Sequence, residues 1–297
     1  MSFQQESPIP MFPLRISKIC TIAAIAAFGL AAGAQQKPTP SGPSPVLVTV
    51  SEVPQPGAED EHAALEAQYA SVLNANKAAQ YYLGMGAITG KPQTLFLSGY
   101  ASLEQMADVH NFDEFTLGEK LAGLDQQHNE LLADANTAIW LFRPMLSNPT
   151  PANLAQMRFM EMIHIHVRLG HAAAFAQVTE QMRDAWAKTD PDFHFSVYQQ
   201  IYGSATDDSY LIVIPVQSLA QIDHHHSLVG KYSQSLDEQA QKQMLDFVRQ
   251  NYVSTESNLF AFTPAMSRLP ASWTKGDTDF WTPQPAATPT KPAAKAN

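Results

Sequence analysis

The stretch Phe193–Asp223, FHFSVYQQIYGSATDDSYLIVIPVQSLAQID, decides the fold. Two runs rich in β-branched and aromatic residues, Phe193–Tyr202 and Tyr210–Val216, flank a segment of Gly, Ser, Thr and Asp. Two strands joined by a turn have this pattern, and the residues after Val216 are typical of a helix start. An earlier stretch, Tyr81–Asp108, predicts the same order of elements. The chain is therefore expected to contain one structural unit twice.

Short matches that keep their order support an internal duplication. The matched segments are His62–Gln68 with His171–Gln177, Ser102–Met106 with Ser218–Ile222, Thr116–Glu119 with Ser235–Glu238, and Phe142–Ser147 with Phe262–Ser267. They lie 109, 116, 119 and 120 positions apart. Four matches in register, on elements of the same predicted type, are hard to obtain by chance.

Each half is predicted to follow the order β-α-β-β-α-β, which is the ferredoxin-like order. The expected strands are Val46–Val53, Tyr81–Ile88, Gln93–Tyr100 and Ala138–Arg143, then Phe159–Arg168, Phe193–Tyr202, Tyr210–Val216 and Asn258–Phe262. Capping boxes at Thr116–Glu119 and Ser235–Glu238 are expected to begin the second helix of each half. Both helices of such a unit cover one sheet face, so two units can bury their open faces together. The predicted fold class is α+β, with two ferredoxin-like repeats packed sheet to sheet as a barrel within one chain.

The N-terminal segment has the composition of a signal peptide. Arg15 and Lys18 precede the apolar run Ile19–Ala32, and the small residues Ala32–Ala34 form a cleavage site. The run is too short to span a bilayer comfortably, so no membrane span is expected after cleavage. Cleavage would also remove Cys20, the only cysteine, and leave no disulfide. The protein is expected in the periplasm or outside the cell.

Composition divides the chain into five segments. They are a signal peptide (1–34), a disordered linker (35–45), repeat 1 (46–150), repeat 2 (151–271) and a disordered Pro/Ala-rich tail (272–297). The formal net charge is −10. An acidic surface of this kind argues against nucleic acid or an anionic membrane as a partner.

In element order and hydrophobic pattern, the chain resembles the dimeric α/β-barrel superfamily in its fused, two-repeat form. The resemblance covers about Val46–Pro270. It implies a ligand between sheet and helices or inside the barrel, and it relates the chain to cofactor-free monooxygenases and haem-binding chlorite dismutase-like enzymes. Haem is a cofactor only by this analogy, because fold does not fix function. Two fused repeats can complete a barrel, so both a monomer and a homodimer are compatible with the sequence.

Histidine and tyrosine on two predicted strands form the candidate ligand site. Strand alternation places His164 and His166 on one face, and His194, Tyr198 and Tyr202 on one face of the next strand. These are the faces that the barrel turns inward, so the residues are predicted to bind a small molecule in the lumen. The alternative interpretation is a solvated sheet face, where His and Tyr are ordinary.

The other histidines give weaker signals. His224 and His226 are the weak metal candidates, because the triplet 224–226 lacks any HExxH or CxxC spacing and is otherwise expected to form an exposed polar turn. His128 is expected to be a core-edge histidine bonded to a backbone carbonyl, while His62 and His171 match each other at helix starts.

The sequence leads to two function hypotheses. One is an exported small-molecule-binding protein with its site in or near the lumen. The other is a haem-dependent or cofactor-free oxidoreductase, and whether the protein is an enzyme stays open.

Overall fold

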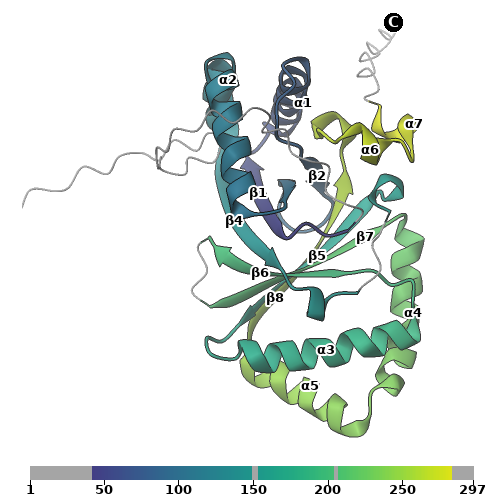
Figure 1. The fold of residues 1–297 in the computed structure, drawn as a ribbon. Helices are drawn as coiled ribbons and strands as arrows, with labels where there is room; N and C mark the ends of the chain where they lie inside the picture. Colours follow the sequence, from purple (N-terminus) through teal and green to yellow (C-terminus); the bar gives the residue numbers. More distant parts are fainter. Residues whose placement is uncertain (1–41, 149–152, 204–206, 283–297) are drawn as a thin grey trace, which may run out of the picture.

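The computed structural model describes residues 42–148, 153–203 and 207–282 (Figure 1). The first half holds β1 (Val46–Pro54), α1 (Glu59–Ala75), β2 (Leu83–Ala87), β3 (Thr94–Tyr100), α2 (Leu103–Leu131) and β4 (Leu132–Phe142). The second holds β5 (Phe159–Val167), α3 (Ala172–Thr189), β6 (Ser196–Tyr202), β7 (Asp208–Val216), α4 (Leu219–Ser235), α5 (Glu238–Asn251) and β8 (Tyr252–Phe262). Two short helices follow, α6 (Ala271–Thr274) and α7 (Thr278–Trp281).

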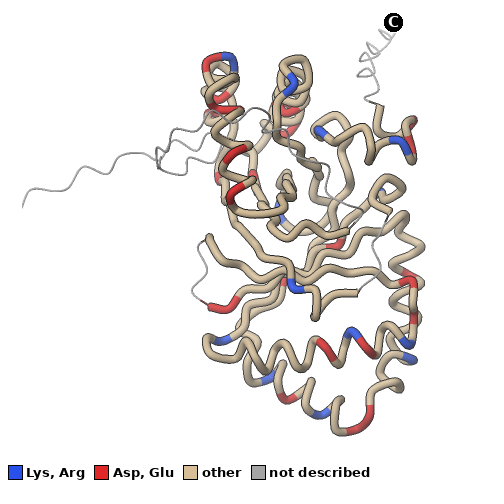
Figure 2. The backbone as a smooth tube through the Cα atoms, viewed as in Figure 1, with Lys and Arg blue, Asp and Glu red and all other residues tan. Residues whose placement is uncertain are grey.

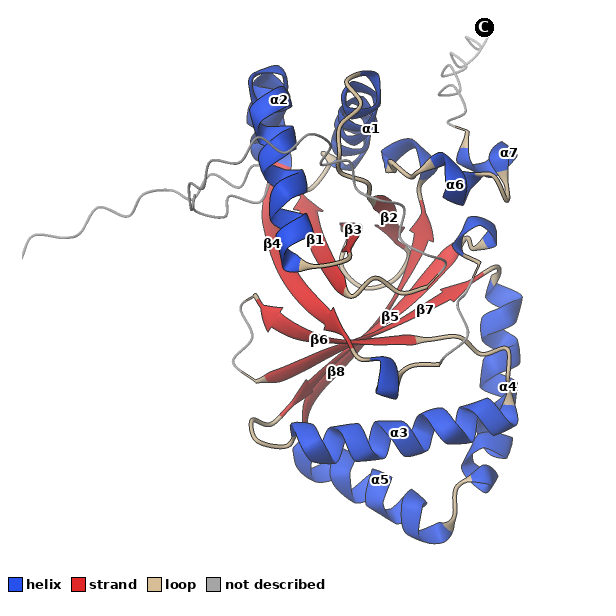
Figure 3. Ribbon diagram, viewed as in Figure 1, coloured by secondary structure: helices blue, strands red, loops and turns tan. Residues whose placement is uncertain are grey.

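The strands close into one barrel in the order β1-β3-β2-β8-β5-β7-β6-β4. Each half contributes a ferredoxin-like sheet, and the two sheets join at β2 with β8 and at β4 with β6. The helices lie outside, with α1 and α2 beside one half and α3, α4 and α5 beside the other (Figure 3). The predicted α+β fold of two repeats packed as an intrachain barrel is confirmed.

Strand alternation separates the barrel interior from the layers under the helices. The interior holds a packed apolar cluster that includes Leu47, Met85, Leu95, Leu97, Trp140, Met160, Met162, Tyr198, Leu211 and Phe260. Separate clusters fill the space between each sheet and its helices. Charged residues lie mainly on the outer helices and turns (Figure 2), so a charged residue buried under a helix is unusual in this fold.

Two predicted helix starts are wrong. The long helix α2 begins at Leu103, well before the predicted capping box at Thr116, and the Ser102 side chain accepts a hydrogen bond from the Gln105 N–H at 3.1 Å. Thr116 lies inside this helix and donates to the Phe112 carbonyl at 2.7 Å. In the second half, Asp237 rather than Ser235 caps α5, accepting from the Ala240 N–H at 2.7 Å.

The predicted tail begins too early, because residues 271–282 fold back onto the barrel. Trp281 is buried in the interior cluster, and its indole N–H donates to the Ala155 carbonyl at 2.8 Å. An ion pair between Arg158 and Asp277 holds this segment beside the start of β5. Trp281 thus covers one end of the barrel.

Residues 283–297, the predicted signal peptide and most of the predicted linker lie outside the described residues. Among the described residues, no helix combines the length and apolar character needed to cross a bilayer.

Candidate metal centre

Two of the predicted site residues come together at the end of the barrel opposite Trp281. His164 and His166 lie on the inner face of β5, with ring centroids 4.1 Å apart. The His164 ring also meets the edge of Trp140 at 5.3 Å. His166 Nδ1 lies 2.9 Å from the Asp207 carboxylate and 3.1 Å from the Ser209 hydroxyl.

The other predicted residues do not converge on this pair. Tyr198 lies in the interior cluster and packs against Phe142. Leu211 on β7 pairs with His164 on one side and with Tyr198 on the other, so a whole strand separates the two residues. His194 precedes β6 and lies toward the opposite end of the barrel, while Tyr202 is 63% exposed.

The weak metal candidates lie within α4 and not in a turn. The His224 side chain is 60% exposed, and its Nε2 lies 3.8 Å from Asp190. His225 between them is buried against Phe193, whose ring centroid is 4.5 Å away. The expected exposed turn is therefore wrong, because α4 continues through all three histidines.

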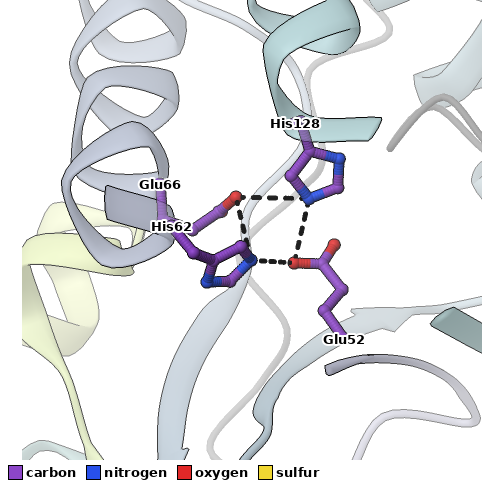
Figure 4. Close-up of side chains that lie close together, drawn as sticks. All are labelled: Glu52, His62, Glu66 and His128. Atoms are coloured by element: carbon purple, nitrogen blue, oxygen red, sulfur yellow. Dashed lines mark hydrogen bonds and ion pairs between the residues drawn. The ribbon is translucent and has the colours of Figure 1, made fainter. Parts of the chain in front are cut away.

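A different group of four side chains converges under the first pair of helices (Figure 4). Glu52 comes from the end of β1, His62 and Glu66 from successive turns of α1, and His128 from the last turn of α2. Their ligand atoms all lie within 4.8 Å of one another. We call these four residues the Glu/His quartet.

The distances in the quartet resemble the edges of a tetrahedral metal site. His62 Nε2 lies 3.0 Å from Glu52 Oε2 and 3.8 Å from Glu66 Oε1. His128 Nε2 lies 3.2 Å and 3.6 Å from the same two oxygens. Bonds of about 2.0–2.2 Å in a tetrahedron place the ligand atoms about 3.4 Å apart. A metal ion at the centre would need only small side-chain adjustments.

All four residues are withdrawn from water, each with 1% or less of its surface exposed. Moving a carboxylate or an imidazolium out of water costs several kcal/mol unless a partner compensates the charge. Tyr69 lies against the quartet. Tyr69 meets the His128 ring edge to face at 6.0 Å and donates its hydroxyl proton to Asp125. Burial is the main cause that raises the pKa of Tyr69, and the Asp125 carboxylate raises that pKa further.

The second repeat has apolar residues at the positions equivalent to most of the quartet. Glu52 pairs with Thr94 and Ala135, and Ile165 pairs with Tyr210 and Thr255, so strand register makes Glu52 and Ile165 equivalent. The helix offsets of 109 and 119 place Glu66 at Phe175 and His128 at Phe247. Burial supports both offsets, since the first matches Tyr69 with Val178 and the second matches Leu121 with Ala240, all of them buried.

The equivalent residues of repeat 2 pack as hydrocarbon. Ile165, Phe175 and Phe247 belong to one apolar cluster, and the Phe175 ring stacks on Tyr210 at 3.9 Å. Only the histidine recurs, as His171, and that residue is exposed before α3. The fold therefore does not require ionisable groups at this place.

Sequence reasoning missed the quartet because its members are spread over residues 52–128 without a local motif. His128 was expected to bond a backbone carbonyl, whereas its ring faces Glu52 and Glu66. One signal was present. Alternation along β1 puts Glu52 on the same helix-facing side as Val46, Val48 and Val50.

No protein-family model matches this chain, and no curated protein matches it in sequence. Solved structures match its shape. The crystal structure of an anthrone oxidase-like protein has 12% identity and a TM-score of 0.51, covering 73% of this chain and 91% of its own. A proposed monooxygenase from Fusobacterium nucleatum subsp. nucleatum has 9% identity and a TM-score of 0.50, covering 74% and 93%.

A chlorite dismutase from Candidatus Nitrospira defluvii in complex with imidazole has 10% identity and a TM-score of 0.45, covering 75% of this chain and 92% of its own. At such identities the likeness concerns the fold alone. The expected resemblance is confirmed at that level: the chain has the fold of the dimeric α/β barrels, in the fused form with two repeats.

Proposed function

We propose that this protein is an exported metal-binding barrel that holds one divalent transition-metal ion at the Glu/His quartet. The observation that carries the proposal is the contrast between the repeats. Repeat 1 buries two carboxylates and two imidazoles where repeat 2 buries Ile165, Phe175 and Phe247. A metal ion bound by all four groups would offset part of the cost of burying two carboxylates and two imidazoles.

The donor set selects the class of ion. Two imidazole nitrogens favour zinc, iron, nickel or copper over calcium and magnesium, which prefer oxygen ligands alone. Two carboxylates balance the charge of a divalent ion. Tetrahedral spacing favours zinc, because Zn²⁺ commonly takes four N, O or S ligands at these distances.

The quartet supports a structural rather than a catalytic ion. Catalytic zinc sites keep a position for water or substrate, whereas structural sites are closed by four protein ligands. Here four protein groups surround the centre, and all are buried. The ion would join the end of β1 to both α1 and α2, so it would stabilise repeat 1.

Metal analysis of the purified protein tests the proposal. We expect one equivalent of metal, and Co²⁺ added to the apoprotein should give the absorption of a four-coordinate site. Saturation at about 100 times Kd should add about 2.7 kcal/mol to the free energy of unfolding.

The two repeats supply a matched control. His62→Ala should abolish stoichiometric binding, and His171→Ala, at the equivalent exposed position, should leave it unchanged. Equal binding by wild type and His62→Ala, or no binding by a folded wild type, would refute the metal site. The export that forms part of the proposal rests on residues 1–34, and a mature N-terminus elsewhere than after Ala34 would count against it.

The described residues do not fit the haem that the resemblance suggested. The layer under α3 and α5 is filled by packed aromatic rings, including Phe175, Tyr210 and Phe247. The barrel interior is filled by its own apolar cluster. The small ligand expected from the sequence would therefore bind toward the end of the barrel where His164 and His166 lie.

A further inference from the structure

The inner face of β5 carries a row of soft and borderline metal ligands. Met160, Met162, His164 and His166 alternate with outward residues, so all four face the interior. Both methionines belong to the interior cluster. Successive members are about 7 Å apart along the strand, so flexible side chains of neighbours can reach a common ion.

His166 is held as metal-ligating histidines usually are. One ring nitrogen, Nδ1, faces the Asp207 carboxylate at 2.9 Å, and the Ser209 hydroxyl donates to the same carboxylate at 3.0 Å. A carboxylate on Nδ1 fixes the proton there and leaves Nε2 as an electron-pair donor.

His164 supplies a second imidazole beside it, with ring centroids 4.1 Å apart. Its Nε2 is buried and has no hydrogen-bond partner among the described residues. An imidazole nitrogen held in this way can serve as a metal ligand.

We propose that Met162, His164 and His166 form a second metal site, which binds Cu(I), and that Asp207 is its positioning residue. Thioether sulfur selects Cu(I) over divalent ions, and imidazole accepts it as well. The site carries no ligand carboxylate, which suits a monovalent ion. It is separate from the Glu/His quartet, which lies under the helices of the other repeat.

Anaerobic titration of the full-length mature protein with Cu(I), in competition with bicinchoninate, tests this site. We expect one tight equivalent and quenching of Trp140 fluorescence, since that indole lies 5.3 Å from the His164 ring. Asp207→Asn should weaken binding about 10–100-fold, as loss of an outer-shell partner does. His164→Ala and His166→Ala should weaken it further.

Methionine variants make the test specific for the soft ligand. Met162→Leu conserves volume and should fold, yet it should weaken Cu(I) binding. Met85→Leu, in the same interior cluster but on β2, should bind as wild type does. Tight Cu(I) binding by the double variant His164→Ala with His166→Ala would overturn the site. Equal effects of Met162→Leu and Met85→Leu on Cu(I) binding would overturn it too. So would no tight Cu(I) equivalent in folded wild type.

The two metal sites can be told apart in one experiment. Glu52→Ile with Glu66→Phe and His128→Phe should remove the divalent ion and leave Cu(I) binding intact. His164→Ala with His166→Ala should do the reverse. Loss of Cu(I) binding in the first variant, while the protein stays folded, would show that only the quartet binds metal and would refute the second site.

Discussion

At the scale of single residues, Glu52 and its equivalent Ile165 show how the side chain at one strand position changes the surrounding chemistry. Ile165 packs under α3 and α5, whereas Glu52 faces two histidines and a second glutamate. Glu52 and Ile165 hold the same register position in their sheets. The difference in chemistry therefore comes from the side chains and from what they bind.

Copying repeat 2 into repeat 1 should produce a metal-independent protein. Glu52→Ile, Glu66→Phe and His128→Phe recreate the apolar set, and Thr94, where repeat 2 has the larger Tyr210, leaves room for the added rings. Replacing a buried ionic group with apolar residues is often stabilising by about 1–4 kcal/mol. We expect the variant to exceed the metal-free wild type by about that amount in urea unfolding, with no response to EDTA. A wild type that also ignores EDTA would contradict this interpretation.

His225 should make the stability depend on mild acidity. Burial is the main cause that lowers its pKa below the ordinary 6.5, although Asp190 opposes the shift. As the pH falls below 6.5 the unfolded chain takes up a proton at this residue before the folded protein does, so the free energy of unfolding decreases. His225→Gln should flatten this decrease between about pH 6.5 and 5. His224→Gln, whose side chain is exposed, is the control, and equal slopes for both variants would exclude His225 as the cause.

At the scale of elements, the cap of α2 is Ser102 in the structure, whereas the capping box in the sequence pointed to Thr116. Ser102→Ala should cost about 1 kcal/mol in the free energy of unfolding, because Ser102 accepts from the Gln105 N–H. Thr116→Ala should change it little, since that threonine is an exposed residue inside α2. Chemical denaturation of both variants decides between the two starts of the helix, and a larger cost for Thr116→Ala would contradict the assignment.

The strands could be predicted more fully than the helices and the site. Alternation in β5 correctly placed His164 and His166 on the interior face, because a period of two has only two outcomes. The cap of α2 was assigned to the wrong residue, because Ser102 and Thr116 both offer capping chemistry and only tertiary packing separates them. The quartet was missed because its convergence depends on how α1 and α2 cross β1.

At the scale of the whole molecule, closure of the barrel within one chain removes free sheet edges. Every strand has two neighbours, so a second chain cannot add to the sheet. The interior cluster joins both halves, with Met85 and Leu95 from one and Met160 and Phe260 from the other. The halves therefore share one core although each has the connectivity of a complete ferredoxin-like unit.

A shared core predicts that repeat 1 cannot remain a monomer by itself. Residues 42–148 alone would expose the inner face of their sheet, including Leu47, Leu97 and Trp140, and an apolar face of this size drives association. We expect the isolated segment to form dimers or larger species in light scattering. Adding the separately produced second half, residues 153–282, should convert these species into a one-to-one complex with the mass of the barrel. A stable monomer of residues 42–148 would show that the two sheets do not depend on each other, whereas a homodimer that the second half displaces would show that pairing between the repeats is preferred over pairing of like sheets.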